Sequence, residues 1–262
     1  MTTAMSGRAL AERDLDGHYR FPDAARMEWV KLRSLRSTWL TLALTAAGAT
    51  SIAAAVGANT KDGTADLTNN ALAGISVGLL LIGSLGVLVM TGEYTSGAIR
   101  STLAAIPNRP MLLAAKAAVF GATALAAGEA AALIAFFVGA ATLPATIPAP
   151  TLADPAVLRA VLLAGAGISL IGLIGLGVGA IVRQTGPAVA TLVGGVYVAT
   201  QFLGAFAPST LGYVPISIVA NSLSTVQRLP YTLSPWAGVG LLCLYAAVLL
   251  GVGGALLARR DA

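Results

Sequence analysis

Six long apolar runs constrain this chain more than any other feature of its sequence. Each run has 19 to 27 residues, and about 20 helical residues cross the hydrocarbon core of a bilayer. The chain of 262 residues is only 10% charged, whereas soluble domains average about 25%. We therefore predict an all-α integral membrane protein whose six spans lie at residues 39–57, 71–90, 117–143, 161–182, 188–206 and 237–257.

Local signals support the boundaries of these spans. Proline fits the first turn of a helix, and Asp or Ser before it caps the free amide groups. Such pairs precede the fourth, fifth and sixth spans as Asp154-Pro155, Gly186-Pro187 and Ser234-Pro235. Residues 1–20 are polar and rich in small side chains, so we expect a flexible cytoplasmic tail there. Residues 21–262 then form a single transmembrane domain.

The placement of Lys and Arg predicts the orientation of the spans. Thirteen of the 16 Lys and Arg residues fall in the N-terminal segment, the second and fourth loops and the C-terminal tail. Positive charge concentrates on the cytoplasmic side of membrane proteins. We therefore expect a multi-pass protein of the cytoplasmic (inner) membrane of a prokaryote, with both termini in the cytoplasm. The basic residues flank spans and form no separate basic domain, which argues against nucleic-acid binding.

The segment before the first span has the pattern of a helix that lies in the headgroup plane. Five side chains share one helical face: Phe21, Ala25, Trp29, Leu32 and Trp39. Basic residues, Arg33 among them, flank this face and can reach the headgroups with long side chains. We predict an interfacial helix whose characteristic residues are Trp29, Leu32 and Arg33.

A second short amphipathic segment lies between the second and third spans. Ser96 and Gly97 open it, and three apolar side chains share one face: Ile99, Leu103 and Ile106. Pro107 ends the helical pattern, and Pro110 fits the first turn of the next helix. A short helix with an apolar stripe at a membrane surface suits docking into a groove of another protein. An ordinary polar loop is the alternative interpretation.

The spacing within this segment resembles the first cytoplasmic loop of ABC-2-type permeases, the membrane subunits of ABC exporters. The residues that carry the resemblance are Glu93, Gly97, Arg100, Leu103, Pro107, Arg109 and Lys116. Met27 to Ser34 also resembles the N-terminal interfacial helix of that family, while Ala98 departs from it, since Thr or Met is common there. The resemblance implies a cytoplasmic coupling helix that contacts an ATPase through Glu93, Gly97, Ile99, Arg100, Leu103 and Pro107.

The resemblance also implies the partners of the chain. A permease of this kind pairs with a second copy or a paralogue, lies in membrane lipid, and works with two ATPase subunits. The sequence has no Gly-x-x-x-x-Gly-Lys-Ser/Thr run to cradle phosphates. We therefore expect no enzyme activity, cofactor or metal in this chain, and ATP and Mg on the partner ATPase. The cargo would be amphiphilic: a drug, a peptide or a lipid-like molecule.

Residues 207–236, on the outer side, contain a further amphipathic pattern. One face holds Ile216, Val219, Leu223 and Val226, and the opposite face holds Ser217, Asn221, Ser224 and Arg228. This pattern predicts a short extracytoplasmic helix between the fifth and sixth spans. Interfacial and re-entrant positions are both open, and the resemblance implies the re-entrant one.

Two polar residues inside spans are candidates for a transport path or gate. Glu129 lies 13 residues beyond Lys116, about 20 Å deeper in a helix, where an unpaired charge is costly. It either lines a wet path or holds helices together as a protonated or hydrogen-bonded group. Gln201 is the second candidate. An ion- or proton-coupled transporter that uses Glu129, or a non-transporting membrane scaffold, are the alternatives to an ABC permease.

Overall fold

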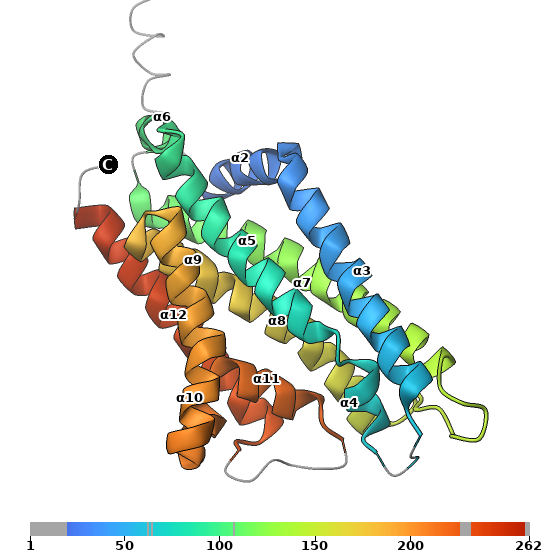
Figure 1. The fold of residues 1–262 in the computed structure, drawn as a ribbon. Coiled ribbons are helices and arrows are strands. Elements are labelled where there is room, and N and C mark those ends of the chain that lie inside the picture. Colours follow the sequence, from blue (N-terminus) through green and yellow to red (C-terminus); the bar gives the residue numbers. More distant parts are fainter. Residues whose placement is uncertain (1–19, 62, 64, 107, 226–231, 260–262) are drawn as a thin grey trace, which may run out of the picture.

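The computed structural model describes residues 20–61, 63, 65–106, 108–225 and 232–259. Within these residues the chain is helical and contains no strand. Six of the described helices are long and apolar enough to cross a membrane, and they run side by side as a bundle (Figure 1). They are α3 (Arg36–Asn59), α5 (Ile75–Thr95), α7 (Arg109–Ala141), α8 (Pro155–Val182), α9 to α10 (Thr185–Phe206) and α12 (Pro235–Arg259). Within the described residues, the prediction of an all-α protein with six helices able to cross a membrane is confirmed.

Most of the span boundaries differ from those predicted by a few residues; the fourth helix, for example, begins at Pro155 and not at residue 161. The second span does not begin at residue 71, because a separate short helix, α4 (Leu67–Ala71), precedes α5. The third begins at Arg109, well before residue 117, since the Asn108 side chain accepts a hydrogen bond from the Met111 amide (3.1 Å) and caps the helix there. The start of α7 therefore extends beyond the apolar run of the sequence.

Helix α8 lies at the centre of the bundle, where it packs against α5, α7 and α12. Glycine makes the α5–α8 contact close: a Cβ added at Gly86 would run into the carbonyl oxygen of Gly172, and one added at Gly175 into that of Gly83. Small residues let helix backbones approach in this way within membranes. Among the described helices, α5 and α8 therefore make the most extensive contact with each other.

The fifth span is irregular. A π-helical turn, η1 (Gly194–Val198), separates α9 (Thr185–Val193) from α10 (Ala199–Phe206). The Tyr197 hydroxyl, in this turn, donates a hydrogen bond to the Ser76 carbonyl oxygen (3.2 Å) and so ties it to α5. Beyond the turn α10 diverges from its neighbours (Figure 1), and Phe206 at its end is 83% exposed.

The segment between the fifth and sixth spans contains a 3₁₀ helix, η2 (Pro208–Tyr213), and α11 (Pro215–Leu223), which packs on α8 and α12. The predicted polar face of α11 is wrong for Asn221, which is buried. Its Nδ2 donates to the Leu233 carbonyl oxygen (2.7 Å), and its Oδ1 accepts from the Thr232 hydroxyl (3.0 Å). These long-range partners explain why a polar side chain faces the protein. Val226 and Arg228 lie outside the described residues.

A single carboxylate joins α4 to the end of α11. Asp66 caps α4 by accepting from the Asn69 amide (3.0 Å). The same carboxylate accepts from the Ser224 hydroxyl (2.8 Å) and from the amide (2.7 Å) and hydroxyl (3.0 Å) of Thr225. Arg159 of α8 donates to the Ser224 carbonyl oxygen (2.9 Å). We call Asp66, Ser224 and Thr225 the α4–α11 clasp.

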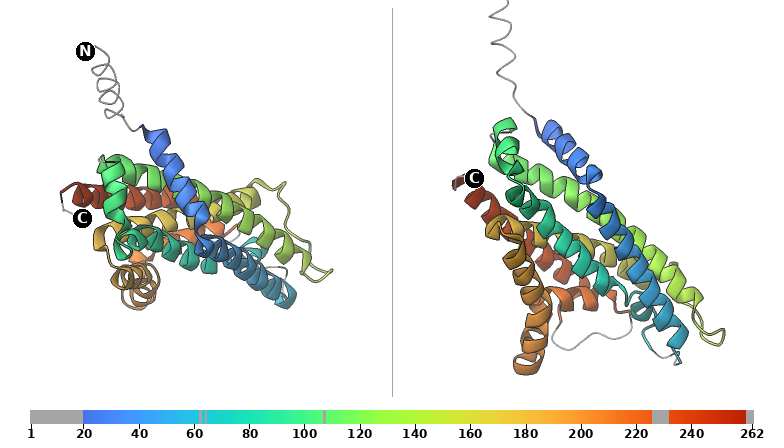
Figure 2. Two further views of the ribbon diagram at one scale, coloured as in Figure 1. Left: turned by 90° about the horizontal axis from the view of Figure 1, so that it is seen from above. Right: turned by 45° about the horizontal axis from the view of Figure 1, so that its top comes forward.

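Two short helices lie at the opposite end of the bundle from the clasp (Figure 1). Helix α2 (Phe21–Ser34) precedes α3 and crosses over α7, on which it packs (Figure 2). Helix α6 (Ala98–Ala105) joins α5 to α7 and begins at Gly97, whose φ of 71° lies in the left-handed region that favours glycine. The predicted short helices before the first span and between the second and third are both present.

Candidate functional site

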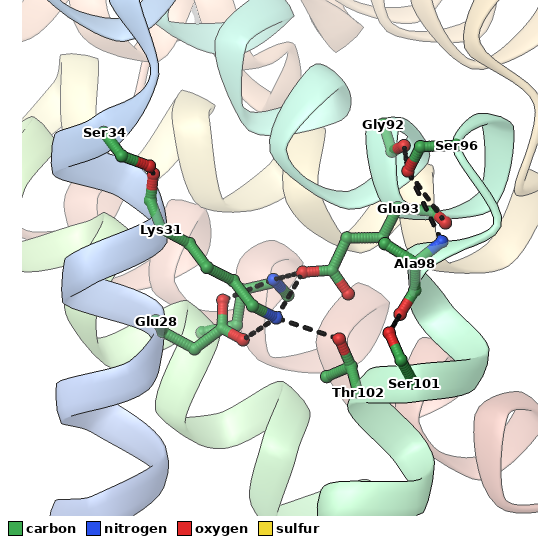
Figure 3. Close-up of polar contacts among 10 residues, drawn as sticks. Glu28, Lys31, Ser34, Gly92, Glu93, Ser96, Ala98, Ser101 and Thr102 are labelled. Atoms are coloured by element: carbon green, nitrogen blue, oxygen red, sulfur yellow. Dashed lines mark hydrogen bonds and ion pairs between the residues drawn. The ribbon is translucent and has the colours of Figure 1, made fainter.

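Four charged side chains from three helices meet where α2 crosses the bundle (Figure 3). Lys116 of α7 pairs with Glu28 of α2 and with Glu93 of α5 (Nζ to Oε1, 2.8 Å). Lys31 of α2 pairs with the same two carboxylates, at 3.1 Å to Glu28 and 2.9 Å to Glu93. We call these four residues the charge cluster. Its two cations and two anions balance.

The sequence explains how each helix delivers its charge. The buried face of α2 is formed by Ala24, Glu28 and Leu32, four residues apart, so Glu28 points at the bundle. Glu93 lies in the last turn of α5, and Lys116 lies two turns into α7. Because α5 ends and α7 begins at the same end of the bundle, the two side chains meet under α2.

Because the cluster is buried, each of its charges depends on the others for compensation. The side chains of Lys116 and Glu28 are 3% and 4% exposed, that of Glu93 is 12% exposed, and that of Lys31 is 33% exposed. An ion removed from water costs several kcal/mol unless its partners compensate for that loss. Every ion of the cluster has two opposite charges within ion-pair distance. Loss of any buried member therefore leaves an uncompensated charge inside the protein.

Lys31 is the member of the cluster nearest to solvent. Burial alone would lower the pKa of its ammonium group, but the carboxylates of Glu28 and Glu93 outweigh burial and raise this pKa above its ordinary value. Lys31 is therefore a full cation at neutral pH.

Helix α6 is fixed to this cluster. The Thr102 hydroxyl accepts a hydrogen bond from Lys31 Nζ (3.0 Å). Ile99 is only 3% exposed, and Leu103 packs on a small apolar cluster formed by Ala24, Ile106, Leu112 and Ala115. The predicted apolar stripe of α6 thus packs on the chain itself. Its insertion into an ATPase stays a prediction. The opposite face is exposed and consists of Ala98, Arg100, Ser101 and Ala104.

The other predicted coupling residues differ in their exposure and in their contacts. Glu93 makes its ion pairs with lysines of its own chain, while Arg100 is exposed. Gly97 is exposed, and a Cβ added there would meet no atom within 4 Å. Glycine is therefore favoured at this position by the positive φ and not by a lack of space for a side chain. Pro107 lies outside the described residues.

The three residues chosen for the interfacial helix do not share one environment. Leu32 is 4% exposed and packs on the bundle, whereas Trp29 is 42% exposed and Arg33 is also exposed. Leu32 lies in line with Glu28 on the buried face, and Trp29 lies one residue around the helix from that line. An exposed tryptophan beside arginine is typical of a membrane interface.

The polar candidates inside the spans lie apart from the charge cluster. The Glu129 carboxyl group is seated against Gly165 of α8, where an added Cβ would run into it. Glu129 Oε2 is buried and has no hydrogen-bond partner among the described residues. The backbone of Gln201 belongs to α10, and its side chain lies outside the described part of the structure.

Sequence reasoning did not identify Glu28 as a site residue. The available signal was its position between Ala24 and Leu32 at helical spacing, which places a carboxylate on an apolar face. Lys116 belonged to the spacing that resembles ABC-2-type permeases, and neither Lys116 nor Lys31 was predicted to form an ion pair. In the residues that the structure describes, no group of three His, Cys, Asp or Glu side chains could hold a metal ion.

A scan against protein-family models finds no match, and a search of curated proteins finds none either. Function is therefore inferred from the site and from the order of the helices.

Proposed function

We propose that this chain is the permease subunit of an ATP-driven exporter of the ABC-2 type, in the cytoplasmic membrane of a prokaryote. Two copies, or this chain and a paralogue, would work with two ATPase subunits that bind ATP and Mg. The cargo would be an amphiphilic drug, peptide or lipid-like molecule. The order of the helices supports this proposal: α2, two spans, α6, three spans, η2 with α11, and a last span. The resemblance of the α6 region to this family supports it as well.

The observation that carries the proposal is the attachment of α6. One face of this short helix is free, and the other is fastened through Thr102 to Lys31 and through Ile99 to the protein interior. The charge cluster then joins α2, α5 and α7. A partner that pushes on the free face of α6 would therefore move three helices together, as a chain without its own nucleotide site requires.

Co-purification of an ATPase tests the proposal. Arg100→Glu reverses a charge on the free face of α6 without touching the cluster, and should abolish capture and stimulation of the ATPase while the permease stays folded. Arg259→Glu is the matched control, because Arg259 is an exposed arginine in the last turn of α12. Normal capture by Arg100→Glu, together with normal transport, would show that α6 is not the coupling element.

An ion- or proton-coupled transporter is the second candidate function. It is favoured by the buried and unpartnered Oε2 of Glu129 among the described residues. Such a protein would co-purify with no ATPase, and Glu129→Gln would abolish gradient-driven transport. Transport that needs ATP hydrolysis by a bound partner, and persists in Glu129→Gln, excludes this candidate. A membrane scaffold would show neither kind of transport.

The proposed orientation has its own test. In a Cys243→Ala background, a single cysteine at Lys61 should react with a membrane-impermeant reagent added to intact cells, and a cysteine at Arg100 should not. Both positions are exposed in the structure, so a difference in labelling reports the side of the membrane. Labelling at Arg100 from outside would reverse the topology.

A further inference from the structure

A cavity of about 400 Å³ lies beside the charge cluster, between α2, α5 and α7. This volume falls within the range of small-molecule sites, about 300–1,000 Å³. One end of the cavity is polar and includes all four residues of the charge cluster, together with Ser34 and Ser96. The other end is apolar and is lined by Leu88, Val89, Val119 and Phe120. The lining thus changes from charged to apolar along the cavity, which is the polarity of an amphiphile.

The cavity opens toward the surface that lipid would cover. Two of its apolar lining residues, Leu35 and Leu88, are 49% and 44% exposed. Leu88 and Ser96 are eight residues apart on the sequence, about 12 Å along a helix. The polar end therefore lies near the end of α5, at the depth where headgroups meet the exposed Trp29 and Trp39. The apolar end lies deeper, at the depth of acyl chains.

The most exposed of the four charges that line this cavity is positive. Lys31 is 33% exposed, whereas the two carboxylates of the cluster are 4% and 12% exposed and are both paired. Two exposed arginines are sequence neighbours of lining residues: Arg33 precedes Ser34 on α2, and Arg36 follows Leu35 at the start of α3. Clusters of basic residues at a membrane surface attract anionic lipids.

From these observations we propose that the cavity is a binding site for an anionic phospholipid. The phosphate group lies beside Lys31, and an acyl chain lies along Leu88 and Val119. The bound lipid fills the space between α2 and α5 next to the cluster. The site depends on the chain alone and would exist whether or not an ATPase partner does.

A single glycine allows this site to be closed without touching the charges. Gly92 lines the cavity, and a Cβ added there would meet no atom within 4 Å. The Cβ of a leucine at this position therefore meets no protein atom, and we expect the rest of its side chain to extend into ligand space. Gly240→Leu on α12 is the matched control, since a Cβ there also meets no atom within 4 Å and Gly240 is not a lining residue.

The experiment is native mass spectrometry of the purified full chain titrated with phosphatidylglycerol or phosphatidylcholine. The wild-type chain should bind phosphatidylglycerol about fivefold more tightly than phosphatidylcholine, the effect of one basic contact at a membrane surface. Gly92→Leu should weaken phosphatidylglycerol binding about tenfold or more, and Gly240→Leu should leave it unchanged. Inorganic phosphate at millimolar concentration should not displace the lipid, because it lacks the acyl chains.

Substitution of Lys31 separates the charge from the shape of the cavity. Lys31→Gln should remove the preference for phosphatidylglycerol, and Lys31→Arg should restore it. Equal binding of the two lipids by the wild-type chain would overturn the anionic part of the proposal. Unchanged phosphatidylglycerol binding by Gly92→Leu would overturn the site itself, and displacement by inorganic phosphate would show that the cavity binds a free anion.

Discussion

Replacement of Lys116 by methionine tests whether the charge cluster acts as one unit. The side chain of Lys116 is 3% exposed, and its ammonium group pairs with both Glu28 and Glu93. Methionine is unbranched and flexible, so it fills the space of the lysine stem. The two carboxylates then share the single cation Lys31, and one negative charge is left without compensation inside the protein.

The structure sets the size of the effect. Removal of one partner from a buried ion pair costs about 3–5 kcal/mol, so Lys116→Met should destabilise the fold by about that amount. Lys31→Met also leaves two carboxylates with one cation, but Lys31 is 33% exposed, so water can enter where its ammonium group lay. This change should therefore cost less, about 1 kcal/mol. The double variant Glu28→Met/Lys116→Met removes one charge of each sign and keeps the Lys31–Glu93 pair. It should be more stable than Lys116→Met alone, because an apolar pair can replace a buried ion pair at little cost.

Thermal unfolding of the purified chain at pH 7 provides the measurement. A loss of 3–5 kcal/mol corresponds to a fall in the unfolding temperature of roughly 6–20 °C in a chain of this size. The reasoning is refuted if Lys116→Met falls no further than Lys31→Met. It is also refuted if the double variant loses the sum of the two single losses, because independent sites add.

Three further predictions concern single positions. Gly97→Ala should cost about 1–2 kcal/mol because φ is 71° there, whereas Gly92→Ala, in helical geometry, should be neutral or stabilising in the same unfolding assay. Folding raises the pKa of Lys31, so the charged Lys31 should contribute its full stabilisation below about pH 10.4, the pKa of an unfolded lysine. That stabilisation should be lost as the pH rises through the pKa of the folded state. Unfolding measured in a series of alkaline buffers should show this loss of stability in the wild-type chain and not in Lys31→Gln. Gly165→Ala should destabilise the chain, because the added Cβ would collide with both the carboxyl group and the backbone nitrogen of Glu129. Glu129→Ala removes only the side-chain collision, so it should recover part of the lost stability in the double variant; a double variant no more stable than Gly165→Ala alone would mean that the carboxyl collision contributes nothing.

The parts of the fold that sequence could predict are those with local causes. Apolar length identified the six spans, and Asp154 before Pro155 marked the start of α8, where the Asp154 side chain accepts from the Ala156 amide (2.8 Å). Gly97 likewise marked the start of α6. In each case the signal lies within a few residues of the structure that it predicts.

The charge cluster could not be predicted in the same way. Glu28 and Lys116 are 88 residues apart, and helical periodicity shows which face a residue occupies without showing which helix covers it. Asn221 illustrates the same limit: its partner Leu233 lies beyond the helix, so its polarity suggested exposure. Pro110 correctly marked the first turn of α7, whereas the span was placed from residue 117 because the apolar run begins later than the capping residue.

Helix α5 connects the two polar assemblies of the molecule. The α4–α11 clasp holds the segment before it, and Glu93 in its last turn belongs to the charge cluster; its 21 residues span about 30 Å. If α5 moves as a rigid body, the two assemblies share one conformational equilibrium. The coupling between them is then reciprocal. If binding of a ligand near the cluster favours opening of the clasp, then breaking the clasp must increase the affinity for that ligand by the same free energy. Substitution of Asp66 would thus change the affinity for a ligand bound near the charge cluster, at the opposite end of the protein.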